Sequence, residues 1–338
     1  MVPYSQVLAH NANLKHATPG LVGVFVGATS GIGLATLRTL VTQLARPRIY
    51  VVGRSRTKFA AELAQLRLDN PQAEITFVES EIALLRNVDH VCLHISRQES
   101  RLDLLFLSAG FLAFGGPHHT EEGLDTCFAL SLYTRMRFVQ RLLPLLHAAP
   151  KPRVLSVLAG GHERPLYLED GDLGLRACQG RAYTAARAVD QATTLHTLAF
   201  AHLASQHPHI AFLHAYPGWV ATGFLSNLIG TLGRSGQVLA WAVEPLWRII
   251  AISVQESGQW QAFHATSERY PSREMIQNGR FDVENVAQSH AAHSGMYLVL
   301  ADGQTGTARD VLGPLEEMGW PEKVWTFLDQ IFEEVIGT

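Results

Sequence analysis

The segment Gly27–Gly33, with the sequence GATSGIG, constrains the fold of this chain more than any other feature. It follows a short apolar run, Leu21–Gly27, and leads into a stretch with helical periodicity, Gly31–Thr42, so it lies between a strand and a helix. Glycines there permit a tight turn and the close approach of a pyrophosphate, and the N–H groups of the helix N-terminus attract the anion. This context predicts a dinucleotide-binding turn with contacts from Gly27, Thr29, Ser30, Gly31, Ile32 and Gly33.

Strand-like and helix-like segments alternate along the rest of the chain. This alternation predicts an α/β fold with a Rossmann-type, doubly wound parallel sheet in a single domain. Further strands are expected at Arg48–Val52, Glu74–Glu79, Leu102–Leu107, Arg153–Ala159, Ile210–Ala215 and Met296–Leu300. Further helices are expected at Phe59–Asp69, Asn87–Ser100, Leu124–His147, Ala182–Gln206 and Pro321–Val335.

No linker divides the 338 residues, a length that suits one large domain. Residues 20–222 are expected to form the dinucleotide-binding core. Residues 223–290 are expected to form a helical region that covers the substrate, and 291–338 a C-terminal strand and helix.

The most apolar stretch, Leu225–Val254, is interrupted by charged residues and by Pro245. A membrane-spanning helix needs roughly 20 uninterrupted apolar residues, so we expect no integral membrane span. Trp241 and Trp247 in this stretch suit a lid over a bulky hydrophobic substrate, with plain core packing as the alternative and peripheral membrane contact as a third.

Charge and cysteine content narrow the class of protein further. The net charge is −3 and no basic stripe is present, so nucleic acid is not an expected partner. The three cysteines, Cys92, Cys127 and Cys178, are scattered and lack metal-ligand spacing. They indicate a reducing, cytoplasmic compartment, no disulfide framework and no metal site.

Four more segments follow in an order typical of one family: Gly53–Ser55 (GRS), Leu107–Gly110 (LSAG), Tyr183–Arg187 (YTAAR) and Pro217–Thr222 (PGWVAT). Together with GATSGIG they resemble the motifs of the short-chain dehydrogenase/reductase family over roughly residues 20 to 225. Later segments, Phe263–Arg273 and Ser294–Tyr297, resemble a fungal branch often involved in secondary metabolism. The resemblance implies further cofactor contacts from Ser108, Ala109, Gly110, Tyr183, Arg187, Pro217, Gly218, Val220 and Thr222.

The resemblance also implies a catalytic set of tyrosine, lysine, serine and asparagine, which this chain changes at three positions. Tyr183 keeps the acid/base position, and Arg187 replaces the lysine that lowers the proton affinity of the tyrosine. Ala159 stands at the serine position and Ser131 at the asparagine position. Ser156, three residues earlier on the expected strand, is predicted to face away from the site.

The loop after Ala159 offers a replacement for the missing groups. It contains His162, Glu163, Arg164 and Tyr167, and the carboxyl ends of parallel strands line the crevice of this fold. His162 is a candidate hydrogen-bond donor or general acid/base, with a solvent-exposed loop histidine as the alternative interpretation.

Arg54, at the end of the second expected strand, bears on the choice of cofactor. An acid there would bind the ribose 2′-hydroxyl of NAD, whereas an arginine suits the 2′-phosphate of NADP. We therefore expect NADP(H). Glu81 and Ile82 stand where the family has an acid and an apolar residue around the adenine, although Glu81 also suits an ordinary surface position.

Three functions remain open from the sequence. The first is an NADP(H)-dependent oxidoreductase acting on a carbonyl or alcohol of a bulky, apolar small molecule. The second is a non-redox cyclase, isomerase or pericyclase on the same scaffold, because two catalytic positions are lost. The third is a non-catalytic dinucleotide sensor. The resemblance also implies a homo-oligomer formed through Leu124–His147 and Ala182–Gln206.

Overall fold

The computed structural model describes residues 2–17, 19–111, 116–168, 173–175, 183–220, 251–280 and 286–337. Its centre is an eight-stranded sheet with the order β3-β2-β1-β4-β5-β6-β7-β8. Every neighbouring pair from β3 to β7 is parallel, and β8 is antiparallel to β7. The strands are β1 Val22–Val26, β2 Arg48–Gly53, β3 Glu74–Glu79, β4 Leu104–Leu107, β5 Arg153–Val157, β6 Ala211–Ala215, β7 Met296–Val299 and β8 Thr305–Gly306.

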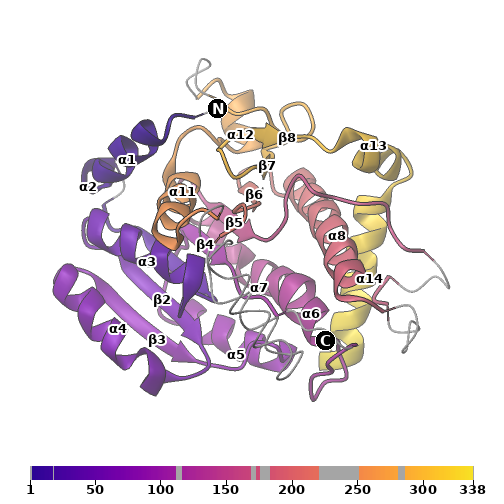
Figure 1. The fold of residues 1–338 in the computed structure, drawn as a ribbon, viewed down its shortest axis with the longest axis horizontal. Helices are drawn as coiled ribbons and strands as arrows, with labels where there is room; N and C mark the ends of the chain where they lie inside the picture. The colour runs from indigo at the N-terminus through magenta and orange to yellow at the C-terminus, as the bar shows by residue number, and fades with distance from the viewer. Residues whose placement is uncertain are drawn as a thin grey trace.

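Helices cover both faces of the sheet (Figure 1). One face carries α3 Gly31–Gln43, α4 Arg56–Asp69 and α11 Val254–Thr266, with α1 Tyr4–Ala12 against α3 and α11. The other face carries α5 Leu85–Ser96, α7 Thr134–His147, α8 Ala185–Gln206 and α14 Trp320–Ile336. Short helices complete the described part: α2 Leu14–Ala17, α6 Thr126–Phe128, α12 Arg273–Gln277 and α13 Arg309–Glu317.

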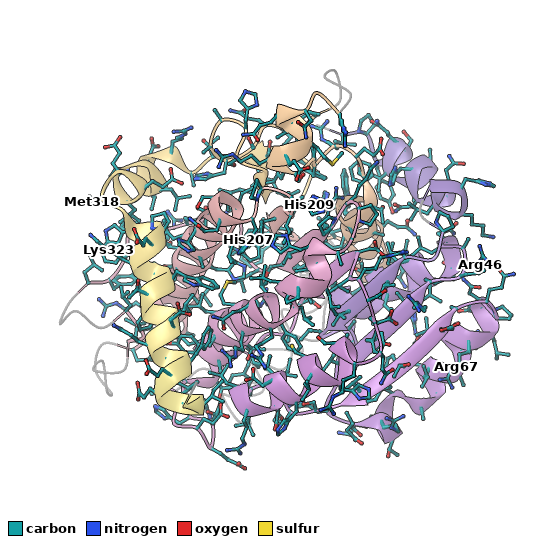
Figure 2. The ribbon with its side chains drawn as sticks, turned by 180° about the vertical axis from the view of Figure 1, so that it is seen from behind. Arg46, Arg67, His207, His209, Met318 and Lys323 are labelled. Atoms are coloured by element: carbon teal, nitrogen blue, oxygen red, sulfur yellow. The ribbon has the colours of Figure 1, made fainter. Side chains whose placement is uncertain are left out.

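The strands could be predicted from the sequence because burial on both faces makes most of them continuous apolar runs. Every residue of β1, β4, β6 and β7 is buried, as expected for central parallel strands covered on both faces. At the edge, β3 alternates between exposed and buried residues. Figure 2 shows the molecule from behind, with Lys323 near the start of α14 on one side and Arg67 of α4 on the opposite side.

The predicted fold class is confirmed, and all seven predicted strands are present with ends shifted by up to two residues. The helix expected at Phe59–Asp69 begins three residues earlier, at Arg56. Three other predicted helices also needed correction. The one expected at Asn87–Ser100 runs over Leu85–Ser96. The one expected at Leu124–His147 is divided into α6, a π-helical turn at Ala129–Tyr133, and α7.

The third correction concerns the helix expected at Ala182–Gln206. It begins only at Ala185, because Thr184 is extended and its side chain accepts a hydrogen bond from the N–H of Arg187. Tyr183 therefore precedes the helix instead of lying on it.

The region expected to cover the substrate is described only in part. Its helix α11 packs on α3, where Trp260 and Phe263 join the core with Leu37, so this part is core rather than cover. Trp241, Trp247 and the rest of 221–250 lie outside the described residues.

Arg135 of α7 joins the ends of two central strands to the helix layer. Its side chain is buried, and its guanidinium donates to the carbonyl of Ala109 (2.6 Å), the carbonyl of Val157 (2.9 Å) and Oγ of Ser156 (2.5 Å). Its Nε donates to the carbonyl of Leu130, inside the π-helical turn (3.0 Å). Burial lowers the pKa of Arg135 to about 9, so the group remains cationic at neutral pH.

We expect Arg135→Met to lower the free energy of unfolding by about 3 to 5 kcal/mol, because it leaves several buried acceptors without a donor. Urea denaturation followed by circular dichroism measures this. The control is Arg86→Met, which removes an exposed arginine paired with Glu121 and should change stability by less than about 0.5 kcal/mol. Similar losses in the two variants would contradict the structural role of Arg135.

Candidate active site at the carboxyl ends of the strands

Packing explains the glycines of the loop between β1 and α3. Gly27 has a φ of +88°, and a Cβ there would lie 2.3 Å from the backbone nitrogen of Ala109. A Cβ on Gly33 would lie 2.7 Å from the carbonyl oxygen of Gly27. Ser30 precedes α3 without a side-chain cap. The loop thus lies close to the end of β4 and leaves the N–H groups of the first turn of α3 for an anion, which fits a pyrophosphate.

The residues after β4 support the same loop. The N–H of Ser108 continues the sheet by donating to Val26, and its Oγ donates to the carbonyl of Gly27 (3.3 Å). The carbonyl of Ala109 accepts from Arg135, and among the described residues no heavy atom lies within 4 Å of a Cβ built on Gly110.

Arg54 extends from the end of β2 beside the loop. A Cβ on the preceding Gly53 would lie 2.5 Å from Cγ2 of Thr29, so this strand end touches the glycine-rich turn. The side chain of Arg54 is 77% exposed, and its Nη1 lies 3.9 Å from Oε2 of Glu81, too long for a hydrogen bond. Both residues line a cavity of about 460 Å³ beside the start of α5.

Arg54 is therefore available to a ligand, whereas its neighbour Arg56 is not. The guanidinium of Arg56 donates to the carbonyl of Phe77 and lies over that ring. Ile82 is buried, and its carbonyl accepts from Thr134 (2.7 Å).

Tyr183 forms its hydroxyl contact with an unexpected group. The hydroxyl donates to Oδ2 of Asp125 (3.1 Å), the residue that caps α6. Burial and then the negative charge of Asp125 raise the pKa of Tyr183 well above its ordinary value. This is the opposite of the expected lowering by Arg187.

The side chain of Arg187 lies on the loop that follows β5. Its guanidinium carbon is 4.3 Å from the centre of the Tyr167 ring, a cation–π contact with the loop after β5.

Ser131 lies inside the π-helical turn and is buried, and its carbonyl oxygen is 3.2 Å from Nδ1 of His196. Ala159, at the position of the family serine, directs its backbone N–H to Nε2 of His214 (3.3 Å). Ser156 faces away from the crevice as expected, since its hydroxyl accepts from Arg135. His162 is exposed after β5, and its ring centre lies 4.2 Å from that of Tyr216, which follows β6.

The segment after β6 approaches its neighbours closely. Gly218 has a φ of +77°, and a Cβ there would lie 2.9 Å from the side chain of Ile252. Val220 forms a parallel bridge with the same Ile252, next to Pro217 and Gly218 in the chain. Thr222 lies outside the described residues.

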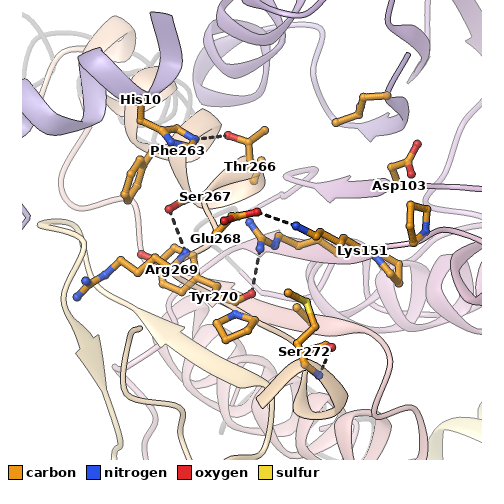
Figure 3. A pocket seen from close by; sticks show the side chains of 18 of the residues that line it. His10, Asp103, Lys151, Phe263, Thr266, Ser267, Glu268, Arg269, Tyr270 and Ser272 are labelled. Atoms are coloured by element: carbon orange, nitrogen blue, oxygen red, sulfur yellow. Dashed lines mark hydrogen bonds and ion pairs between the residues drawn. The ribbon is translucent and has the colours of Figure 1, made fainter. Parts of the chain in front are cut away.

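A larger cavity, of about 670 Å³, lies at the opposite end of the sheet (Figure 3). Its lining includes Leu21, Asp103 and Arg153, from the amino ends of β1, β4 and β5. Lys151 pairs with Glu268 there (2.6 Å). None of the predicted site residues that the structure describes lines this cavity.

Comparisons with known proteins identify the family. The short chain dehydrogenase family model matches residues 22–167. An oxidoreductase of Emericella nidulans is 34% identical, over 99% of both chains. The chain belongs to the short-chain dehydrogenase/reductase family. The short-chain dehydrogenase/reductase SAT2 of Stachybotrys chartarum is 29% identical over 73% of both chains, and such fungal relatives support the expected branch.

The fold of this short-chain dehydrogenase/reductase also resembles that of solved family members. The NADPH-bound carbonyl reductase from chicken fatty liver has a TM-score of 0.55 at 17% identity, covering 85% of this chain and 99% of that one. We conclude that the chain is an oxidoreductase of the short-chain type. No helix in the described ranges is long and apolar enough to cross a membrane.

Two residues that contact candidate site residues were not predicted from the sequence: Asp125, which accepts from Tyr183, and Tyr216, which contacts His162. Asp125 had a local signal, because an acid three residues before Phe128 is a typical helix cap, and its side chain does accept from that N–H. Its contact with Tyr183 joins residues 58 apart in the chain and had no signal. Tyr216 stands directly before Pro217, inside the stretch that resembles the family.

Replacing Asp125 by Asn should lower the pKa of Tyr183, because the neighbouring negative charge is removed while an amide can still cap α6. Burial is the larger cause and remains, so the pKa should stay above its ordinary value. Titration of the tyrosine 13Cζ resonance, assigned with Tyr183→Phe, measures this. Glu121→Gln, an exposed control nearby, should leave the pKa unchanged. An unaltered titration in the Asp125 variant would contradict the charge effect.

Proposed function

We propose that this short-chain dehydrogenase/reductase is an NADPH-dependent carbonyl reductase for bulky, largely apolar small molecules. The observation that carries the proposal is the joint position of the glycine-rich loop and Arg54. The loop fits a pyrophosphate. Arg54 extends from the adjoining strand end, is exposed, and makes no close carboxylate bond within the part of the chain that the structure describes. An exposed guanidinium is suited to a 2′-phosphate, because its planar fork can bond two oxygens.

The environment of Tyr183 supports reduction rather than alcohol oxidation. NADPH, when bound, supplies the hydride that the carbonyl carbon receives. The raised pKa of Tyr183 disfavours the tyrosinate that alcohol oxidation would need as a base. In reduction the hydroxyl, which donates to Asp125 in this structure, passes its proton to the carbonyl oxygen instead. The transfer is favourable because an alkoxide is more basic than tyrosinate, and solvent returns the proton to Tyr183.

Exposed apolar side chains support a hydrophobic substrate. Phe111, Leu168 and Trp219 are 37%, 45% and 65% exposed, and they follow β4, β5 and β6 respectively. All three therefore lie in loops at the carboxyl end of the sheet, where this fold forms its crevice. Exposed apolar side chains in the loops of three neighbouring strands suit a surface that binds an apolar molecule. We propose the cytoplasm as the compartment and a homo-oligomer as the assembly, both from family resemblance.

A non-redox cyclase or isomerase is the second candidate. It is favoured by Ala159, whose N–H is occupied by His214, and by a tyrosine whose pKa is raised. Products with the mass of the substrate, formed without added cofactor, would support it. A gain of two hydrogens that requires NADPH would reject it. The oxidoreductase relatives disfavour both this candidate and a non-catalytic sensor.

Arg54→Gln should weaken NADPH binding about 10- to 100-fold, the effect of losing a charged hydrogen bond, and leave NADH binding nearly unchanged. Calorimetric titration with each nucleotide measures this. Arg309→Gln changes an exposed arginine at the start of α13 and should alter neither affinity. Equal affinity of the wild type for NADPH and NADH would contradict the proposed cofactor preference.

Tyr183→Phe should lower kcat at least about 100-fold, because the proton donor is lost, while the Kd for NADPH stays nearly constant. Substrate-dependent NADPH consumption, followed at 340 nm with a panel of apolar ketones, measures turnover. Tyr4→Phe, on α1, is the control and should retain full activity. Turnover that persists in Tyr183→Phe would exclude the assigned role.

A further inference from the structure

One face of α8 binds the loop that follows β5. Gln191, Thr194 and Thr197 are three residues apart, fully buried, and therefore on the same face of the helix. Oε1 of Gln191 accepts from the N–H of Tyr167 (2.9 Å), and its amide donates back to the carbonyl of the same residue (3.3 Å). Thr194 bonds both the N–H and the carbonyl of Arg164 (3.0 and 2.7 Å). The helix thus satisfies loop backbone groups that have no strand partner.

Thr197 continues this face into a buried chain of three side chains. Its hydroxyl donates to Oε1 of Glu163 (2.7 Å) and lies 2.8 Å from Nδ1 of His214. Nε2 of His214 accepts from the N–H of Ala159, so the ring proton is on Nδ1 and is donated to Thr197. Burial and the charge of Arg135 lower the pKa of His214 to about 3, which keeps the ring neutral.

The two ends of this chain hold one short turn. His214 bonds Ala159, and Glu163 accepts from the N–H of Gly161 (3.1 Å). The N–H of His162 closes the turn on the carbonyl of Ala159 (3.0 Å). Between them, Gly160 lies so close to the backbone of His214 that a Cβ would come within 2.0 Å of its carbonyl oxygen.

This turn fixes the place of His162. The backbone on either side of His162 is bonded to the buried side chains of His214 and Glu163. The His162 ring is exposed at the carboxyl end of β5 and contacts Tyr216. The family serine that would bind the substrate oxygen is replaced by Ala159, directly before this turn. His162 is the exposed hydrogen-bonding side chain that the turn presents.

We infer that the buried chain Glu163–Thr197–His214 positions His162 as the group that hydrogen-bonds the substrate oxygen in place of the absent serine. The inference rests on the proposed reductase function for its chemistry, but the positioning itself can be measured without turnover. His162 would be the catalytic residue, and Thr197, Glu163 and His214 the positioning residues.

Thr197→Val tests the inference, because it keeps the side-chain shape and removes the hydroxyl. The first readout is the NMR resonance of the Cε1–H group of His162, which is assigned by its loss in His162→Gln. In the wild type, the neighbouring Tyr216 ring shifts this resonance. We expect Thr197→Val to move this resonance toward that of a free histidine. We also expect it to lower kcat about tenfold with the KM for NADPH unchanged.

Two matched variants serve as controls. Thr197→Ser keeps the hydroxyl and should restore the wild-type resonance and kcat. Thr193→Val makes the same change on the same helix, where the buried hydroxyl of Thr193 has no hydrogen-bond partner among the described residues, and should alter neither readout. Glu163→Ala breaks the chain from the loop side and should move the resonance as Thr197→Val does, which covers the case in which Thr197→Val fails to fold.

A double-mutant cycle separates positioning from general stability. In the His162→Gln background, Thr197→Val should cost no further kcat, because the residue through which it acts is already absent. An additive loss would overturn the inference, and so would a His162 resonance unmoved by Thr197→Val and Glu163→Ala. If the wild type oxidises no NADPH with any substrate while the resonance moves as expected, the reductase function fails and the positioning of His162 stands.

Discussion

A buried guanidinium connects the parts from which this site is built. Arg135 bonds backbone at the end of β4, in β5 and in the π-helical turn that contains Ser131. Leu107 and Ser156 are paired in the sheet at this point, so the cation lies beneath the adjoining strand ends. A charge is costly to bury and needs all these acceptors, which fixes the relative position of the strand ends and the helix. The position of the crevice at the carboxyl ends of these strands therefore depends on Arg135.

The electrostatics around Tyr183 differ from those expected of its family because of one helix boundary. With α8 starting at Ala185, Tyr183 is not on the helical face of Arg187, and its hydroxyl reaches Asp125 instead. A neighbouring carboxylate disfavours tyrosinate, whereas a neighbouring cation would favour it. Arg187 meanwhile stacks on Tyr167, which is itself bound by Gln191. The site therefore holds a protonated tyrosine, a state suited to donating hydrogen bonds.

Ala159 replaces the family serine, and the loop that follows it is bonded to a layer of buried polar side chains on α8. Thr194, Thr197 and Gln191 are all without exposure, and each bonds that loop. Buried polar groups are stabilising only when their partners are present, so such a layer specifies one loop conformation. His214, which contacts Thr197 of this layer, is neutral because burial and the charge of Arg135 lower its pKa.

The sequence by itself determined the strands, the glycine-rich turn and the family, because these depend on apolar runs and on residue types within a few positions of one another. It also predicted that Ser156 faces away. Only the tertiary structure decided that Asp125 meets Tyr183, that α11 packs on α3 and that Arg187 lies on Tyr167. These contacts join segments 20 to more than 200 residues apart, or depend on where a helix starts. Local patterns do not encode such contacts, because burial and packing against distant elements select among the local alternatives.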